Sequence, residues 1–238
     1  MMSPLREGRE TCRTWCAAPS VAFMCRVPRL LKGADSFIAV KTTAGKGFAR
    51  LPMTFPVGAD GRVRRARQVP SPNQDARPER ATIDLLVIHN ISLPPGQFGG
   101  DDVFRLFTNC IKLQDNPAYA SLEGLRVSAH FFIRRNGELI QFVPCHRRAW
   151  HAGVSRWGMR TNCNDFSVGI ELEGTDDRPF EEAQYQVLAA LASSLCTTYP
   201  VRDMLGHSDV APGRKTDPGP HFDWQRLKHL MTVCPRHF

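Results

Sequence analysis

Short apolar runs alternate with amphipathic segments from about residue 83 onward, which predicts strands interleaved with helices. Residues 84–89 contain an uninterrupted Leu-Leu-Val-Ile run, as in a strand that is buried on both faces. Residues 166–172 predict another strand. Residues 128–135 and 138–143 flank Asn136-Gly137, a dipeptide typical of a tight β-hairpin. The pattern therefore predicts strands in both halves of this region.

Helical spacing of apolar side chains is clearest in residues 181–198, and Pro200 is expected to end that helix. Two Asp residues open residues 101–109, where they suit the first turn of a helix. Residues 223–231 predict a short final helix. Together these elements predict an α/β fold of the mixed α+β type. A central mixed β-sheet would be flanked by helices in a single domain of residues 53–238.

Residues 1–52 show no sustained periodicity and mix Arg, Cys, Pro and Gly, which predicts a disordered extension. A second interpretation is that the natural protein starts at Met53 and that the upstream residues are a mis-called start. Nine of the 31 Lys and Arg residues lie in this segment, with three of the 23 Asp and Glu residues. The basic excess thus belongs largely to the extension. Nucleic-acid-binding domains cluster positive charge on the folded part, so we expect no nucleic-acid partner.

The eight Cys residues favour a reducing compartment. No pair has the two-residue spacing of a zinc knuckle or a redox motif, and their scatter is typical of reduced thiols in a cytosolic protein. No stretch approaches the roughly 18–20 apolar residues that a membrane helix needs. Export stays open as an alternative, because Arg6, Arg9 and Arg13 precede a short apolar patch. That patch contains a Pro and lacks a convincing cleavage site, so we predict a cytoplasmic protein without a membrane partner.

The turn-rich segment GHSDVAPGRKTDPGP, residues 206–220, carries residue types that bind metals. His207 and Asp217 could share an ion with His89, which closes the first predicted strand. Two His and one carboxylate form a three-ligand zinc site with a fourth position free for water. The Pro and Gly residues between His207 and Asp217 predict a stiff loop that contains no helix and fixes the spacing of the ligands. The residue types alone leave open that His89 is a hydrogen-bonded structural histidine.

Glu171 and Lys215 are the candidates for proton transfer and charge stabilisation. Glu171 lies among Val, Gly, Ile and Leu residues, where desolvation would raise its pKa toward the range of a general base. Glu173 is expected on the same strand face. Lys215 could stabilise a developing oxyanion or be an ordinary surface cation. Trp150 and His151 are expected to line a cleft wall, although His151 is equally compatible with a structural role.

Five blocks of the sequence resemble a known family in their residues and their order. They are LLVIHNISLPPGQFGG, LRVSAHFFIRRNGELIQFVP, RAWHAGVS, CNDFSVGIELEGTDD and GHSDVAPGRKTDPGP. From about Phe55 to the C-terminus, the chain resembles the AmpD-type 1,6-anhydro-N-acetylmuramyl-L-alanine amidases. These belong to the type-2 N-acetylmuramoyl-L-alanine amidase and peptidoglycan-recognition superfamily. Residues 1–52 are not part of the resemblance.

The resemblance implies roles for particular residues of this chain. His89, His207 and Asp217 would bind one Zn²⁺ per chain, Glu171 would act on the water, and Lys215 would polarise the scissile carbonyl. Substrate contacts carry over to a further set of residues, which are Asn90, Arg126 and Tyr119. The chain departs from the family at Asn162, where relatives often have a basic residue and where Arg160 stands two positions earlier.

The activity that the resemblance implies is hydrolysis of the amide bond between 1,6-anhydro-N-acetylmuramic acid and L-alanine. The substrate would be a small cytoplasmic anhydro-muropeptide of peptidoglycan recycling, through which the enzyme would affect β-lactamase induction, and the protein would act as a monomer. Two alternatives stay open. One is a periplasmic or phage amidase that acts on intact peptidoglycan, and the other is a non-catalytic peptidoglycan-binding module.

Overall fold

The computed structural model describes residues 53–233 and 235–238. Residues 1–52 lie outside the described residues. The disordered extension and the alternative start at Met53 therefore stay predictions.

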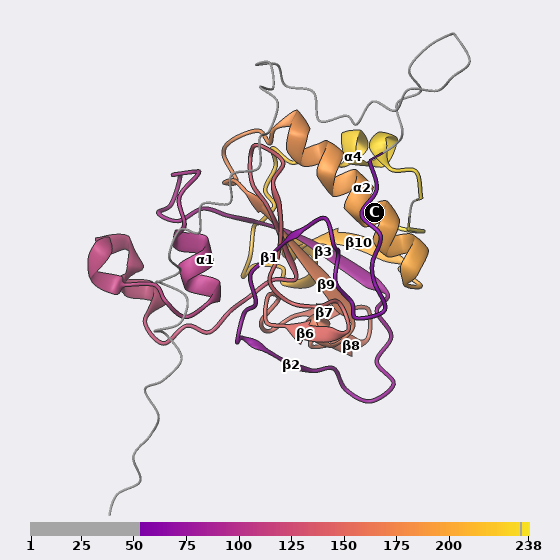
Figure 1. Cartoon of the computed structure of the whole chain (residues 1–238), viewed down its shortest axis with the longest axis horizontal. Helices are drawn as coiled ribbons and strands as arrows, with labels where there is room; N and C mark the ends of the chain where they lie inside the picture. The colour runs from indigo at the N-terminus through magenta and orange to yellow at the C-terminus, as the bar shows by residue number, and fades with distance from the viewer. Residues whose placement is uncertain (1–52, 234) are drawn as a thin grey trace, which may run out of the picture. The chain divides into compact units, whose positions relative to one another are not determined.

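A six-stranded mixed sheet forms the centre of the described chain (Figure 1). Its strands, in spatial order, are β1 (Arg67–Gln68), β5 (Leu139–Gln141), β4 (Phe131–Ile133), β9 (Ser167–Glu173), β3 (Leu85–Ile91) and β10 (Asp203–Gly206). The four neighbours β4, β9, β3 and β10 are parallel, while β5 is antiparallel to β4 and β1 is parallel to β5. The mixed sheet predicted from the sequence is confirmed.

One face of the sheet is covered by α2 (Glu182–Thr198), which packs in turn against α4 (Trp224–Leu230) (Figure 1). The apolar side chains of α2 share a buried cluster with Ile88 and Ile170 of the central strands. The side chain of Gln184 accepts a hydrogen bond from the backbone N–H of Glu181 at 3.0 Å, which stabilises the start of α2. Full burial of one such aliphatic side chain contributes about 1.5–3 kcal/mol. This face therefore supplies much of the stability of the fold.

The opposite face carries shorter elements. Figure 1 shows β2, β6, β7 and β8 on the side of the sheet away from α2. The strands on this side are β2 (Gln74–Ala76), β6 (Arg147–Ala149), β7 (Arg156–Trp157) and β8 (Arg160–Thr161). The helical segments outside α2 and α4 are α1 (Asp102–Phe107), η1 (Leu113–Asp115), η2 (Pro117–Leu122), η3 (Cys163–Asp165) and α3 (His207–Val210). Phe104 and Phe107 of α1 pack edge-on against Phe142, in a cluster that also contains Phe132.

The predicted strands, hairpin and helices are confirmed, with shorter hairpin strands and boundaries shifted by a few residues elsewhere. The exclusion of helix from the loop between His207 and Asp217 was wrong, because α3 covers His207–Val210. The carboxylate of Asp209 accepts the backbone N–H of Gly206 at 2.7 Å and so starts this single turn. Pro212 follows the turn, so it ends the helix without interrupting it.

Cys145 and Cys163 are buried thiols outside any disulfide bond. Among the described residues, no helix combines the length and the apolar character that a bilayer crossing requires.

Candidate metal centre

The candidate ligands lie at one edge of the sheet, at the carboxyl ends of parallel strands. Glu171 of β9 is in register with His89 of β3. Gly206 of β10 is in register with Ile88, which brings the next residue, His207, to the level of His89. Ligand sites of sheets with parallel strands form at such carboxyl ends. The topology therefore brings His89 together with His207, which follows it by 118 positions in the sequence.

Three ligand atoms form a nearly equilateral triangle. Nδ1 of His89 lies 3.0 Å from Nδ1 of His207 and 3.0 Å from Oδ2 of Asp217, and the distance between Nδ1 of His207 and Oδ2 of Asp217 is 3.1 Å. Two ligands bonded at about 2.0–2.1 Å to a tetrahedral zinc ion are about 3.3 Å apart, so the triangle fits such an ion to within a few tenths of an ångström. The three residues are a possible metal site.

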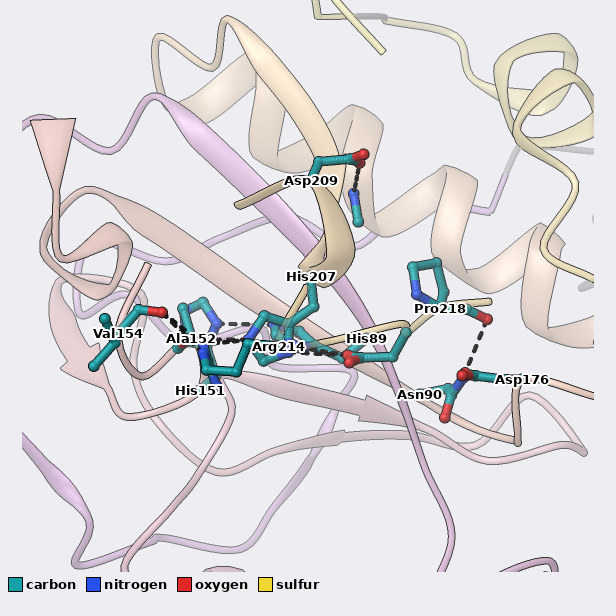
Figure 2. Close-up of polar contacts among 12 residues, drawn as sticks. His89, Asn90, His151, Ala152, Val154, Asp176, His207, Asp209, Arg214 and Pro218 are labelled. Atoms are coloured by element: carbon teal, nitrogen blue, oxygen red, sulfur yellow. Dashed lines mark hydrogen bonds and ion pairs between the residues drawn. The ribbon is translucent and has the colours of Figure 1, made fainter. Parts of the chain in front are cut away.

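The outer nitrogen of each histidine is held by the protein (Figure 2). Nε2 of His207 lies 3.0 Å from the carbonyl oxygen of Ala152, which can only accept, so Nε2 carries the hydrogen. Nε2 of His89 lies 2.9 Å from Nδ1 of His151. With its one hydrogen on Nε2, each ring presents a bare Nδ1 to the centre. Two lone pairs and a carboxylate oxygen then face one another, an arrangement that a cation stabilises.

The pKa values of two candidate ligands, His89 and Asp217, are shifted in directions that favour metal binding. Burial lowers the pKa of His89 to about 4, so its ring is neutral at pH 7. Burial disfavours the charged form of Asp217, but the close contacts of its carboxylate with the rings of His207 and His89 hold the pKa of this carboxyl well below its ordinary value. The site thus offers a neutral imidazole and an ionised carboxylate, the forms that bind metal ions.

The loop that joins His207 to Asp217 is closed by backbone hydrogen bonds. The N–H of Ser208 donates to the carbonyl of Asp217 at 3.0 Å, and the N–H of Lys215 donates to the carbonyl of Ala211 at 3.1 Å. A Cβ at Gly206 would lie only 2.8 Å from Cδ of Pro218. The spacing predicted from the Pro and Gly residues is therefore fixed by a closed backbone ring together with one close glycine–proline contact.

Two carboxylates on β9 have opposite environments. Glu173 accepts backbone hydrogen bonds on both oxygens, from Gly99 at 2.6 Å and from Arg135 at 3.0 Å. Glu171 is 8% exposed, and its Oε2 has no hydrogen-bond partner among the described residues. Burial and the charge of Asp217 raise the pKa of Glu171 well above its ordinary value, while Lys215 acts in the opposite direction. Glu173 is thus a structural residue, and Glu171 is free to exchange a proton.

Lys215 is exposed on the loop that carries Asp217. Its charge lowers the pKa of both Glu171 and His89, which places the ammonium group within electrostatic reach of the candidate base and a ligand.

The predicted substrate contacts are not gathered as closely. The side-chain N–H groups of Asn90 donate to Asp176 at 2.6 Å and to the carbonyl of Pro218 at 3.1 Å, so Asn90 ties two loops together (Figure 2). Arg126 is exposed, and its role as a substrate contact stays a prediction.

Each of the three aromatic candidates is hydrogen-bonded within the protein, and a cleft wall formed by Trp150 and His151 stays a prediction. Tyr119 has no exposed surface, and its hydroxyl donates to Asp102 at 2.6 Å, so it joins η2 to α1. Trp150 is half-buried, and its backbone N–H donates to Oγ of Ser128 at 3.1 Å. His151 is buried below His89 and has no nitrogen left for a substrate, which favours the structural alternative for this residue.

Arg160 is held away from the centre. Its guanidinium donates to both carboxylate oxygens of Asp84 at 3.0–3.1 Å and lies 3.8 Å from the ring centroid of Phe166. Asp84 directly precedes β3, at the end of the strand opposite His89. Arg160 therefore does not take the place of the basic residue that relatives often have at the position of Asn162.

Sequence reasoning missed Arg214, which supports the histidine site from the loop. Its Nη2 donates to the carbonyl oxygens of Ala152 at 2.6 Å and Val154 at 2.7 Å. The Ala152 carbonyl is the same one that holds His207. No signal in the sequence distinguishes Arg214 from an ordinary surface cation. Gly169 of β9, which packs against the ring of His151, could have been found from the sequence, because a glycine inside a strand indicates that another group approaches the backbone closely.

Comparisons with known proteins agree with this geometry. The family model described as N-acetylmuramoyl-L-alanine amidase matches residues 79–220. The 1,6-anhydro-N-acetylmuramyl-L-alanine amidase AmpD of Escherichia coli K12 is 56% identical over 169 residues, which cover 70% of this chain and 92% of that protein. The N-acetylmuramoyl-L-alanine amidase AmiD of the same organism is 40% identical over 130 residues, 47% of each protein. The crystal structure of a selenomethionine AmpD derivative is similar at a TM-score of 0.71 and 54% identity, covering 73% of this chain and 98% of that one.

Proposed function

The chain belongs to the N-acetylmuramoyl-L-alanine amidase family of hydrolytic enzymes, and we propose that it is a zinc enzyme that cleaves 1,6-anhydro-N-acetylmuramyl peptides. The bond broken is the amide between the lactyl group of the anhydro sugar and L-alanine. The observation that carries the proposal is the triangle of His89, His207 and Asp217 beside the unpaired carboxylate of Glu171. The extent of the match to the E. coli AmpD amidase supports the choice of substrate.

His89, His207 and Asp217 would hold the zinc ion. When bound, zinc supplies a Lewis acid that lowers the pKa of a water toward neutrality. The carboxylate of Glu171 takes a proton from the attacking water as its oxygen bonds to the amide carbon. The raised pKa of Glu171 suits this step, because it holds the proton and then gives it to the leaving nitrogen.

Lys215 has a separate role in this proposal. Its ammonium group stabilises the negative charge that develops on the amide oxygen as the carbonyl bond opens. Cleavage of the C–N bond then yields the anhydro-muramyl acid and a free peptide amine, with the water supplying the hydroxyl group and the proton.

Arg126 is proposed as a contact for a carboxylate of the stem peptide. Its planar guanidinium suits bidentate binding, and its exposure leaves it available to a ligand. We further propose that the protein acts in the cytoplasm as a monomer within peptidoglycan recycling. The scattered cysteines and the buried thiols of Cys145 and Cys163 support a reducing compartment.

The test is incubation of the purified full chain with a soluble anhydro-muropeptide, followed by mass spectrometry of the products. We expect release of the intact peptide, loss of activity with a chelator and recovery with added Zn²⁺. A parallel reaction contains intact sacculi. Faster cleavage of sacculi than of the soluble substrate would contradict the proposed substrate class, and chelator-resistant cleavage would contradict the zinc mechanism.

A further inference from the structure

His151 lies against the outer edge of His89, on the side away from the ligand triangle. Nδ1 of His151 is 2.9 Å from Nε2 of His89, and the two rings meet edge to face with centroids 5.0 Å apart. Nε2 of His151 is 3.1 Å from Oγ of Ser167. These three side chains are all at least nine-tenths buried, so they form a continuous chain of hydrogen bonds inside the protein.

The chain of hydrogen bonds has one direction that leaves His89 able to bind a metal. Nδ1 of His89 must be bare, so its hydrogen is on Nε2 and is donated to Nδ1 of His151. His151 then carries its own hydrogen on Nε2 and donates it to the hydroxyl oxygen of Ser167. The opposite direction would place a hydrogen on Nδ1 of His89 and block the ligand position.

The backbone around His151 leaves its ring little freedom. A Cβ at Gly169 would lie 2.4 Å from Cγ of His151, so β9 approaches the ring closely enough to exclude any side chain there. The N–H groups of His151 and Ala152 both donate to Oδ1 of Asn164, at 3.2 and 2.8 Å. Ser167 is fixed in turn, because its carbonyl accepts a hydrogen bond from the half-buried Arg77 at 2.7 Å.

We propose that His151 and Ser167 are positioning residues that orient His89 and thereby set the zinc affinity of the centre. Metal-bound histidines usually donate their second N–H to a carboxylate, a carbonyl or a water. Here the acceptor is an uncharged imidazole, which makes His89 less basic than a carboxylate partner would. A zinc ion held by His89 would then keep more of its positive charge, which would favour ionisation of water. This inference rests on the zinc site of the proposed function.

The experiment measures the zinc dissociation constant of the full chain by competition with a chromophoric chelator. His151→Leu removes both hydrogen bonds, and we expect zinc affinity to fall about 10–100-fold. His151→Asn places an amide oxygen near the position of Nδ1, so it should recover most of that loss. Ser167→Ala should give a smaller loss than His151→Leu, because it removes only the last acceptor.

His130→Leu is the matched control. His130 is also a buried histidine, but it bonds to the N–H of Gly169 and the carbonyl of Arg147 rather than to a ligand. We expect the His130→Leu variant to bind zinc as tightly as the wild type, even if the substitution lowers the stability of the fold. The absorption spectrum of the Co²⁺-loaded protein gives a second readout, and it should change in His151→Leu and stay unchanged in His130→Leu.

Circular dichroism and thermal unfolding establish which variants are folded. If His151→Leu does not fold, the test rests on Ser167→Ala and His151→Asn. The proposal is overturned if the folded His151 and Ser167 variants bind zinc as tightly as the wild type. It is equally overturned if His130→Leu weakens zinc binding as much as His151→Leu. A wild-type protein that binds no zinc would instead contradict the proposed function.

Discussion

The two faces of the paired strands β3 and β9 differ in how their character changes along the strands. On the face that meets α2, Leu86 and Ile88 lie beside Val168 and Ile170, and a polar residue of β3, Asn90, follows only near the carboxyl end. On the opposite face, β3 changes from aliphatic to polar toward His89, while β9 has no aliphatic side chain from Ser167 to Glu171. The residues of this face are Leu85, Val87 and His89 on β3 and Ser167, Gly169 and Glu171 on β9.

The face that meets α2 therefore contributes to stability, and the opposite face of the same two strands carries the candidate catalytic and metal-binding groups. Aliphatic side chains are stabilised by burial alone, whereas a buried polar group costs free energy unless it is hydrogen-bonded. On the polar face the imidazoles of His89, His151 and His130 are all bonded. By contrast, Oε2 of Glu171 has no hydrogen-bond partner in the part of the chain that the structure describes. An unpaired carboxylate beside three metal-binding side chains is the point where this face can act on a substrate.

Glu171→Gln should give the largest effect, because it removes the proposed base while keeping the shape of the side chain. We expect kcat for anhydro-muropeptide to fall about 10²–10⁴-fold. The bound zinc, measured by atomic absorption, should stay at the wild-type level. Turnover near the wild-type rate would show that another group accepts the proton.

Ile170→Ala changes the opposite face at the neighbouring position of β9. We expect it to lower the free energy of unfolding by about 2–5 kcal/mol, because it leaves a cavity in a fully buried cluster. Chemical denaturation measures this loss, and zinc affinity below the unfolding transition should be unchanged. Ile170→Val is the conservative control, with an expected cost of about 0.5–1.5 kcal/mol. A lower zinc affinity in folded Ile170→Ala would show that the two faces are coupled.

Arg214→Ala tests the support that the loop gives to the polar face. Removal of the guanidinium from the Ala152 carbonyl should loosen His207 and weaken zinc binding about two- to tenfold, the equivalent of one hydrogen bond. Arg156→Ala is the matched control, because its guanidinium donates to Gly158 on the β7–β8 hairpin and not to Ala152. Equal zinc affinities in the two variants would exclude a positioning role for Arg214.

The smallest effect is expected in the pH dependence of stability, and it arises from His130, a buried histidine on the polar face. Burial, with the charge of Arg77, holds the pKa of His130 well below its ordinary value of 6.5. The unfolded chain therefore binds a proton that the folded chain excludes, and the stability is complete above pH 6.5 and decreases as the pH falls below it. Thermal unfolding of metal-free protein between pH 8 and 5 measures this decrease. His130→Leu should show a shallower decrease, and an identical slope would contradict this role.

The largest elements follow from local patterns. The apolar run of β3 and the helical spacing of α2 were predictable because each reflects burial of a whole segment. The short strand β10 was missed, since its four residues carry no local pattern of their own. The single turn of α3 was wrongly excluded, because its start depends on the side chain of Asp209 and not on the later prolines.

The sequence by itself determined which residues could perform the chemistry, because residue type and strand position restrict metal ligands and bases to a few side chains. The tertiary structure showed why Glu171 and not Glu173 has an oxygen without a partner, since both lie on one strand face and the fold supplies the backbone N–H groups that satisfy Glu173. It also decided which nitrogen of His89 and of His207 faces the centre. The groups that fix each ring lie more than 50 positions away in the chain, so hydrogen bonding across the fold, rather than any local pattern, sets the site.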